Sequence, residues 1–260
     1  MEHRLQAQVV EICRRLHARG WVANHDGNVT AKVGPDRILA TPTAVSKAEV
    51  TEEMLLLLDL EGKRISGRLK PFGEVTLHLE CYRAREDVRA VVHAHPPTAT
   101  GFACAGVELP VAMMPEAVVS LGPAIPTAAY AAPGPAAAAA AGDLVRRYDA
   151  ILLASHGALT VGVDLEQAYL RMELVEHYAR IAKVALEIGG PRSLPPADVQ
   201  KLCEARAKAG LGPRTSTAPP ATAPRAAGAM ERAATLALAG SDPELARIVA
   251  QEIERALKGS

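Results

Sequence analysis

Three histidines that follow apolar segments are the residues of this sequence best suited to bind a metal ion. His93 and His95 end the run Val-Arg-Ala-Val-Val-His-Ala-His, and His156 follows Ile-Leu-Leu-Ala-Ser. On a β-strand the side chains of residues i and i+2 leave the same face, so the imidazoles of His93 and His95 can converge on one point. Three histidines with one open position are typical of catalytic Zn²⁺, whereas structural zinc usually takes four ligands rich in cysteine.

The His-x-His pair alone has a simpler interpretation, in which two polar residues mark the edge of a strand. Pro96 and Pro97 stop the strand directly after the pair, and His156 repeats the arrangement beside the flexible Gly157. This third histidine favours a metal site. The sequence predicts Zn²⁺ and leaves Mn²⁺, Co²⁺ and Fe²⁺ open.

Glu74 is the candidate general base. It follows the turn Lys-Pro-Phe-Gly at 70–73 and opens a predicted helix directly before the histidine strand. An alternative is that its carboxylate only complements the positive end of the helix dipole, as glutamates in a first turn often do. His78 lies on the same helical face, and we interpret it as a packing or hydrogen-bonding residue because the other histidines already supply the ligands.

Two polar turns at strand ends are candidate anion-binding segments. They are Asp26-Gly27-Asn28 and Thr41-Pro42-Thr43, and each can present backbone N–H groups and side-chain donors. The alternative is ordinary turn chemistry, which these residue types also support. His25, beside the first turn, could face a substrate.

Local patterns predict the elements that carry these residues. The apolar residues of 4–19 fall on one helical face, and Gly34-Pro35-Asp36 joins two short strands as a hairpin. The remaining predicted elements are strands over 55–59, 88–95 and 150–154 and helices over 74–85 and 165–188. Hairpins with interspersed helices indicate an antiparallel or mixed sheet flanked by helices.

Composition excludes several classes of partner. Lys+Arg and Asp+Glu number 29 each, so no charge field favours nucleic acid or an anionic membrane surface, and small molecules or copies of the chain are the expected partners. No apolar stretch approaches the ~20 residues of a membrane helix. Four cysteines without a Cys-x-x-Cys pair, and an N-terminus without a secretory pattern, favour reduced thiols in the cytoplasm.

The chain divides at a segment rich in proline, alanine and threonine. We expect a catalytic domain over 1–211, a linker over 212–228, and a tail over 229–260. The tail has helical composition, including Ser241-Asp242-Pro243 as a helix start, and it also has the composition of a partly disordered extension.

Together these motifs resemble the class II aldolase/adducin family. The resemblance rests on Gly27-Asn28-Val29-Thr30, the turn at 41–43, Glu74, the His-Ala-His segment at 93–95, and His156-Gly157. It covers roughly residues 5–210 in order and with similar spacing. Tyr130, in Ala-Ala-Tyr-Ala-Ala-Pro-Gly, also matches a family stretch, and there we favour a structural role.

The resemblance implies an α/β fold of three layers, α/β/α, with a central, mostly antiparallel sheet. It also implies a homotetramer with active sites at subunit interfaces. By the same resemblance, His93, His95 and His156 are the metal ligands and Glu74 is the catalytic acid/base. The substrate-binding residues that it implies, for a phosphate group, are Gly27, Asn28 and Thr43.

Two departures from the family pattern concern the substrate. Where the sugar-phosphate aldolases carry a pair of serines before the glutamate, this chain has Phe72 and Gly73, and no tyrosine lies in Val-Ala-Met-Met-Pro-Glu at 111–116. In the family's aldolase for fuculose phosphate, a tyrosine from a neighbouring subunit acts as an acid toward the aldehyde. These losses suggest a substrate that differs from the standard sugar phosphates and lacks a phosphate, unless Lys70 or His25 replaces the missing anion contacts.

The expected activity is zinc-dependent retro-aldol cleavage of a small ketose phosphate or related hydroxylated carbonyl compound, through an enediolate that the metal stabilises. The glutamate at position 74 favours the aldolases of the family, because the family's epimerases resemble a variant that carries aspartate at this position. Decarboxylation, dehydration and epimerisation pass through the same intermediate and are not excluded by the sequence. A non-catalytic adducin-like scaffold is a further possibility, which the retained histidines and Glu74 disfavour.

Overall fold

The computed structural model describes residues 2–110, 112–132 and 134–213. Within these ranges eight strands form one sheet in the order β4-β3-β2-β1-β5-β8-β7-β6. Neighbouring strands pair antiparallel, except β6 and β7, which run parallel. The strands are β1 Asn28–Val33, β2 Arg37–Ala40, β3 Leu56–Asp59, β4 Arg64–Ser66, β5 Ala90–Ala94, β6 Thr127–Ala128, β7 Ala150–Leu153 and β8 Gly157–Gly162.

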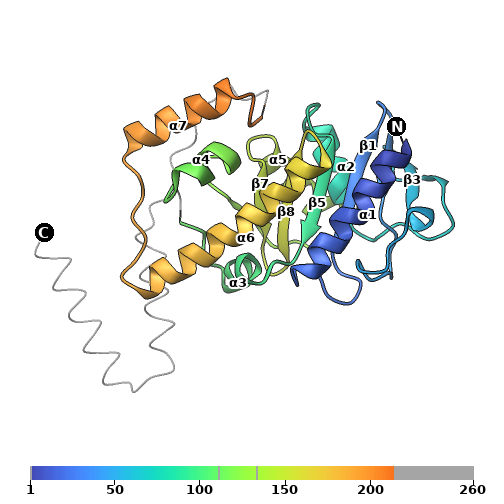
Figure 1. The fold of residues 1–260 in the computed structure, drawn as a ribbon, viewed down its shortest axis with the longest axis horizontal. Coiled ribbons are helices and arrows are strands. Elements are labelled where there is room, and N and C mark those ends of the chain that lie inside the picture. The colour runs from blue at the N-terminus through green and yellow to red at the C-terminus, as the bar shows by residue number, and fades with distance from the viewer. Residues whose placement is uncertain (1, 111, 133, 214–260) are drawn as a thin grey trace, which may run out of the picture. The chain divides into compact units, whose positions relative to one another are not determined.

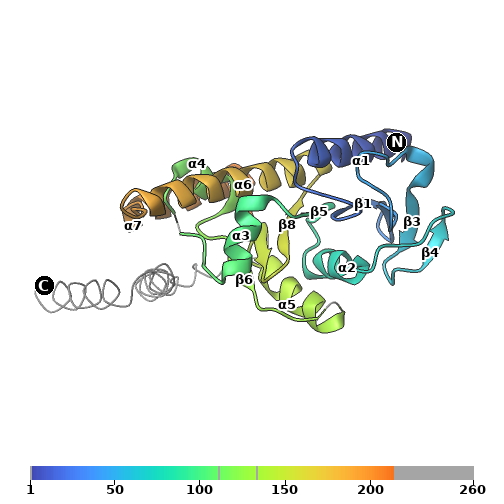
Figure 2. The ribbon, with the colours of Figure 1, turned by 90° about the horizontal axis from the view of Figure 1, so that it is seen from below.

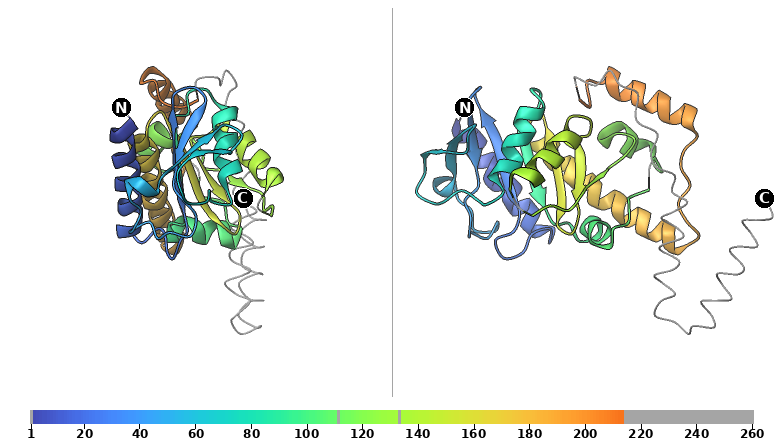
Figure 3. Two further views of the ribbon diagram at one scale, coloured as in Figure 1. Left: turned by 90° about the vertical axis from the view of Figure 1, so that its right-hand side faces the viewer. Right: turned by 180° about the vertical axis from the view of Figure 1, so that it is seen from behind.

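Helices cover both faces of this sheet (Figures 1 and 2). With α1 and α6 on one face and α2 and α5 on the other, the described body has three layers, as the end-on view in Figure 3 shows. The helices are α1 Glu2–Ala18, α2 Val75–Ala84, α3 Pro97–Ala105, α4 Pro115–Leu121, α5 Pro135–Val145, α6 Leu165–Glu187 and α7 Pro196–Lys208, with a 3₁₀ turn η1 at Glu52–Met54.

The strand side chains alternate between two apolar cores. Val92 of β5 packs with residues of α1 and α6, while the adjacent Val91 packs with residues of α2 and α5. Both valines are fully buried, as a strand covered on two faces requires. The α/β fold with a mostly antiparallel sheet is therefore confirmed.

The structure also refines the predicted elements. The hairpin of β1 and β2, the helix α1 and the long helix α6 lie where the patterns predicted them. The histidine strand is shorter than expected at both ends, since β5 spans Ala90–Ala94 and leaves His95 outside. His95 instead donates its backbone N–H to the carbonyl of Trp21 at 2.8 Å, and α3 begins two residues later.

Strand order brings the candidate residues to one edge of the sheet. β5 lies between β1 and β8, and the β1–β5 register places Asn28 opposite His93. β7 and β8 form a hairpin whose turn at 154–156 carries His156 beside the end of β5. The sheet thus joins three segments that are far apart in the sequence.

Most of the expected linker and the whole expected tail lie outside the described residues, which end at residue 213. The last helix of the described body is α7, which ends at Lys208. Among the described residues, none of the helices is both long enough and apolar enough to cross a membrane.

Candidate metal centre and active site

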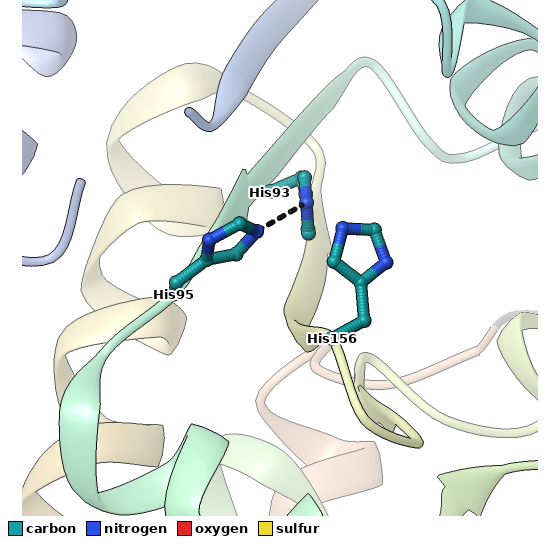
Figure 4. A group of neighbouring side chains, drawn as sticks. All are labelled: His93, His95 and His156. Carbon is teal, nitrogen blue, oxygen red and sulfur yellow. Dashed lines mark hydrogen bonds between the residues drawn. The ribbon is translucent and has the colours of Figure 1, made fainter. Parts of the chain in front are cut away.

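His93, His95 and His156 form one compact cluster. One ligand atom from each ring lies within 4.8 Å of those of the other two, and the Nε2 atoms of His93 and His95 are 3.2 Å apart. Figure 4 shows the rings facing one another, two from the β5 segment and one from the turn after β7. The structure therefore brings together the three residues predicted as ligands.

Two glycines allow this close approach. A Cβ atom on Gly157 would lie 2.6 Å from Cδ2 of His95 and 2.6 Å from the carbonyl oxygen of Ala94. Gly27, with φ of +70°, lies against β5 from the other side, where a Cβ would be 3.0 Å from the carbonyl oxygen of His93. At Gly157 a Cβ would have to displace the histidine segment, and at Gly27 it would lie 2.5 Å from Cγ1 of Val22 in a left-handed conformation that favours glycine.

The turn that holds His156 has unusual backbone geometry. Ser155 has a φ of +56°, in the left-handed region that residues with a Cβ seldom occupy. The backbone N–H of His156 donates to the carbonyl of Leu153 at 3.0 Å and closes a tight turn. This turn aims the His156 ring back at the end of β5.

Burial favours the neutral form of His93 and His95, which is the form that binds a metal. His93 is fully buried, and its Nδ1 lies 2.9 Å from the carbonyl oxygen of Ala158, to which an Nδ1–H donates. That tautomer leaves the Nε2 lone pair for a ligand. Burial, followed by the neighbouring His95 and His156, lowers the pKa of His93 well below its ordinary value, and burial also lowers the pKa of His95.

This donor set fits a divalent metal ion. Where imidazole nitrogens converge on one space and burial disfavours the charged forms of His93 and His95, their lone pairs repel one another unless a cation or a shared proton lies between them. A carboxylate also lies close to the cluster, since Asp26 is 3.6 Å from Nδ1 of His95. Imidazole and carboxylate groups are suited to Zn²⁺ and to several other divalent ions.

Glu74 lies against the same cluster. Its carboxylate oxygens are 3.2 Å from Nε2 of His156 and 3.5 Å from Nε2 of His93. Glu74 occupies the N-cap position of α2, yet its side chain makes no capping hydrogen bond. The carboxylate is therefore turned toward the histidines rather than used to cap the helix.

Asn28 connects β1 to this carboxylate. Its Nδ2 donates to Glu74 Oε2 at 3.4 Å, while its Oδ1 is buried without a hydrogen-bond partner among the described residues. A buried amide oxygen without a partner is costly, so a bound group that donates to it would be stabilised there.

Thr43 is linked to the segment that precedes Glu74. Its backbone N–H donates to the carbonyl of Lys70 at 3.0 Å, and the adjacent Pro42 pairs with Pro71. The turn is thus fastened to the segment that leads into Glu74. The structure gives Thr43 no direct contact with the histidines.

The residues at the positions of the family's serine pair cannot bind an anion through their side chains. Phe72 is 5% exposed, packs in the core and meets the ring of His78 edge-on. Gly73 has no side chain, and a Cβ there would meet nothing within 4 Å. His78 itself is buried with its Nδ1 2.8 Å from the hydroxyl of Thr30 and lies outside the ligand cluster.

A pocket of about 480 Å³ opens beside Glu74 and His156. Its other walls come from the start of α2, from the end of β7 and from the segment between β6 and α5. Sequence reasoning missed this pocket and favoured a structural role for Tyr130, whose side chain is 72% exposed and lines it. The one trace of the pocket in the sequence is the alanine-rich run at 135–141, whose short side chains leave space beside α5.

Comparison with known proteins identifies the family. Residues 7–183 match the model of the class II aldolase and adducin N-terminal domain. The chain belongs to this family. Its members include the L-fuculose phosphate aldolase of Methanocaldococcus jannaschii, which is 34% identical over 69% of this chain and 96% of the relative.

Other class II aldolase relatives carry different names. The 3-oxo-tetronate 4-phosphate decarboxylase of Pectobacterium atrosepticum is 33% identical over 69% of this chain and 84% of the relative. Among solved structures, YgbL of Escherichia coli, described as a putative aldolase/epimerase/decarboxylase, superposes with a TM-score of 0.72 at 28% identity, covering 78% of this chain and 99% of that one. The family likeness thus supports an enzyme with a candidate metal centre and leaves the reaction open.

Proposed function

We propose that the chain is a zinc-dependent lyase of the class II aldolase type, which cleaves and forms a C–C bond in a small ketose phosphate or related hydroxylated carbonyl compound. The observation that carries the proposal is the convergence of three histidines and one carboxylate within a single cluster. In this proposal His93, His95 and His156 hold the ion, and Glu74 is the acid/base.

A divalent ion held by these histidines would supply a Lewis acid that withdraws electrons from the substrate carbonyl. Glu74 would then transfer the proton. When the C–C bond breaks, the hydroxyl on the departing carbon loses its proton to water and becomes the aldehyde carbonyl. The electron pair of the broken bond stays on the carbon next to the ketone carbonyl, and the protonated carboxyl of Glu74 delivers a proton there. In the condensation direction the ionised carboxylate removes the same proton.

Asn28 has a supporting part in this chemistry. Its amide N–H, 3.4 Å from Glu74 Oε2, helps to hold the carboxylate at the edge of the cluster. Its unpartnered Oδ1 is an acceptor for a substrate hydroxyl. With Gly27 and Thr43, Asn28 forms the substrate-binding segment that we propose.

Few protein groups near these residues could bind an anionic end of the substrate. Phe72 is committed to the core, Gly73 offers no side chain, and Lys70 and His25, which could replace them, both lie in exposed positions. We therefore propose that the nucleophilic donor lacks a phosphate group. Faster turnover with dihydroxyacetone than with dihydroxyacetone phosphate would support this part, and activity with the phosphorylated donor alone would contradict it.

The main test separates metal binding from proton transfer. Protein purified without chelator should contain about one divalent ion per chain, and Glu74→Gln should keep that ion but lose about 10²- to 10⁴-fold in kcat. The assay pairs dihydroxyacetone phosphate, dihydroxyacetone, glycolaldehyde and pyruvate donors with short aldehydes. Asp36→Asn, an exposed carboxylate in the hairpin turn, is the matched control. Retained activity in Glu74→Gln would contradict the role of Glu74.

Decarboxylation is the second candidate, and the similarity to a decarboxylase at 33% identity favours it over dehydration and epimerisation. Loss of CO₂ from a carboxylate on the carbon next to the carbonyl leaves the same carbanion, which Glu74 would protonate. Release of CO₂ from a 3-oxo acid, with no condensation of aldehydes, would select this reaction over the aldolase.

We further propose a cytoplasmic homotetramer with its active sites at subunit interfaces. The support is the family likeness together with the widely spaced, unpaired cysteines. Mass measured in solution by light scattering tests the assembly, and a monomer at micromolar concentration would contradict it.

A further inference from the structure

The walls of the pocket beside Glu74 and His156 are mainly aliphatic. Six alanines, two leucines and two glycines line it, against the hydroxyls of Thr76, Tyr130 and Ser155 and the two candidate active-site residues. The pairs that define its apolar walls are Ala128 and Ala129 at the end of β6, Leu153 and Ala154 at the end of β7, and Ala137 and Ala138 of α5.

The pocket owes its room to the short side chains of α5. This helix packs against α2 on the same face of the sheet, and Ala137 and Ala138 in its first turn face the space beside Glu74. Longer side chains at these positions would fill it. Ala139, the next residue along, is exposed and does not line the pocket.

We infer that this pocket binds the aldehyde half of the substrate and selects an aliphatic substituent of several carbons over a polyhydroxylated one. The inference rests on the proposed aldol reaction, because the pocket is continuous with the acid/base and one ligand of that site. A volume of about 480 Å³ exceeds what a two- or three-carbon aldehyde fills.

The selection follows from hydrogen-bond balance. A chain of hydroxyl groups placed against alanine and leucine walls loses water and regains few partners, whereas methylene groups gain from leaving water. Each additional methylene buried in the pocket raises kcat/KM about fourfold by this effect. An apolar pocket disfavours a hydroxylated analogue by about 10- to 100-fold.

Matched aldehydes test this selection. In condensation with the best donor, propanal should exceed glyceraldehyde, which has the same carbon skeleton, by about 10- to 100-fold in kcat/KM. Pentanal, which has two more methylenes, should exceed propanal by about 16-fold in kcat/KM. Equal or faster reaction of glyceraldehyde would overturn the inference while leaving the aldol reaction standing.

Two leucine substitutions on one helix locate the effect. Ala137→Leu should lower the pentanal-to-propanal ratio of kcat/KM about tenfold or more, because leucine occupies the space of the two extra methylenes. Ala139→Leu makes the same change at an exposed position outside the pocket and should leave the ratio unchanged. Equal ratios in the two variants would overturn the assignment of this pocket.

A binding measurement separates the pocket from the reaction. Titration calorimetry with pentanohydroxamate and with a hydroxamate whose tail carries hydroxyl groups compares their affinities for the Zn²⁺-loaded protein without turnover. Tighter binding of the alkyl form that Ala137→Leu weakens and Ala139→Leu does not would support the pocket even if the aldol assay failed. Equal affinities, or no binding of the alkyl form, would overturn it.

Discussion

The histidine cluster at the end of β5 and the arginine cluster around Asp149 are both polar groups enclosed by this fold, and they differ in charge balance. Asp149, fully buried before β7, accepts from Arg85 at 2.6 Å, from Arg171 at 2.8 Å and from Arg206. Those arginines also donate to backbone carbonyls of neighbouring segments. Cations and anions are thus both supplied by the chain itself.

The histidine cluster has no such internal cation among the described residues. His156 and His93 meet the carboxylate of Glu74 at 3.2 and 3.5 Å, and burial lowers the pKa of His93 and of His95, which disfavours their charged forms. Arg85, Arg171 and Arg206 join α2, α6 and α7 to the start of β7 through Asp149, whereas the histidine cluster presents donor atoms that could hold an ion. The comparison teaches that burial alone does not mark a candidate metal centre, and that the convergence of imidazole and carboxylate groups without a cation from the described residues does.

Removing one histidine should have the largest effect. His95→Ala takes away one of the three proposed ligands, and we expect metal affinity to fall by at least about 100-fold, since even the loss of a partner that orients a ligand costs 10- to 100-fold. Turnover should be lost with the metal. Plasma emission spectroscopy measures the ion per chain, and circular dichroism checks that the fold persists. Unchanged metal content would contradict the site.

Breaking the arginine cluster should affect stability instead. Asp149→Asn leaves Arg85, Arg171 and Arg206 buried without their shared counterion, and such a loss costs about 3–5 kcal/mol of unfolding free energy. Urea unfolding measures the change. Metal content and kcat per folded molecule should stay as in the parent. A fall in kcat at full folding would show that the two clusters are coupled.

Much of the histidine cluster could be predicted from sequence because each ligand follows a strong local pattern. An apolar strand and its stop at Pro96 mark His93 and His95, and a second apolar strand and Gly157 mark His156. Glu74 needed the family resemblance, since a first-turn glutamate has an equally ordinary role.

The arginine cluster and the pocket could not be predicted in this way. Arg85, Arg171 and Arg206 stand in separate elements with no shared motif, and only the packing of α6 and α7 brings them to Asp149. The alanine run of α5 carries no polar signal at all. The alanine run leaves a pocket only because of the elements that α5 packs against, and a local sequence pattern does not contain that information.

A smaller change should loosen the histidine cluster without removing a ligand. In Gly157→Ala the new Cβ would lie 2.6 Å from both His95 Cδ2 and the Ala94 carbonyl oxygen, so the His95 ring must shift. We expect metal affinity to fall about 10- to 100-fold, as for lost orientation of a ligand. Competition with a chelating dye measures it. Gly101→Ala, where a Cβ meets nothing within 4 Å, is the control.

His78 offers the smallest effect and separates burial from metal binding. It is a buried histidine outside the cluster, and burial lowers its pKa to about 3. The unfolded chain, with an ordinary pKa near 6.5, therefore binds more protons between pH 6.5 and 3, and stability falls as the pH drops through this range. His78 should account for about 1.4 kcal/mol of the loss at pH 5.5.

Urea unfolding of chelator-treated protein at pH 7.5 and 5.5 measures this contribution. His78→Asn loses the contact with Thr30 at both pH values, but its stability should decline less between them, by about the amount assigned to His78. An equal decline in the two proteins would mean that His78 gains its proton in the folded state. In protein purified without chelator, metal content should be the same in the parent and in His78→Asn, because His78 lies outside the histidine cluster.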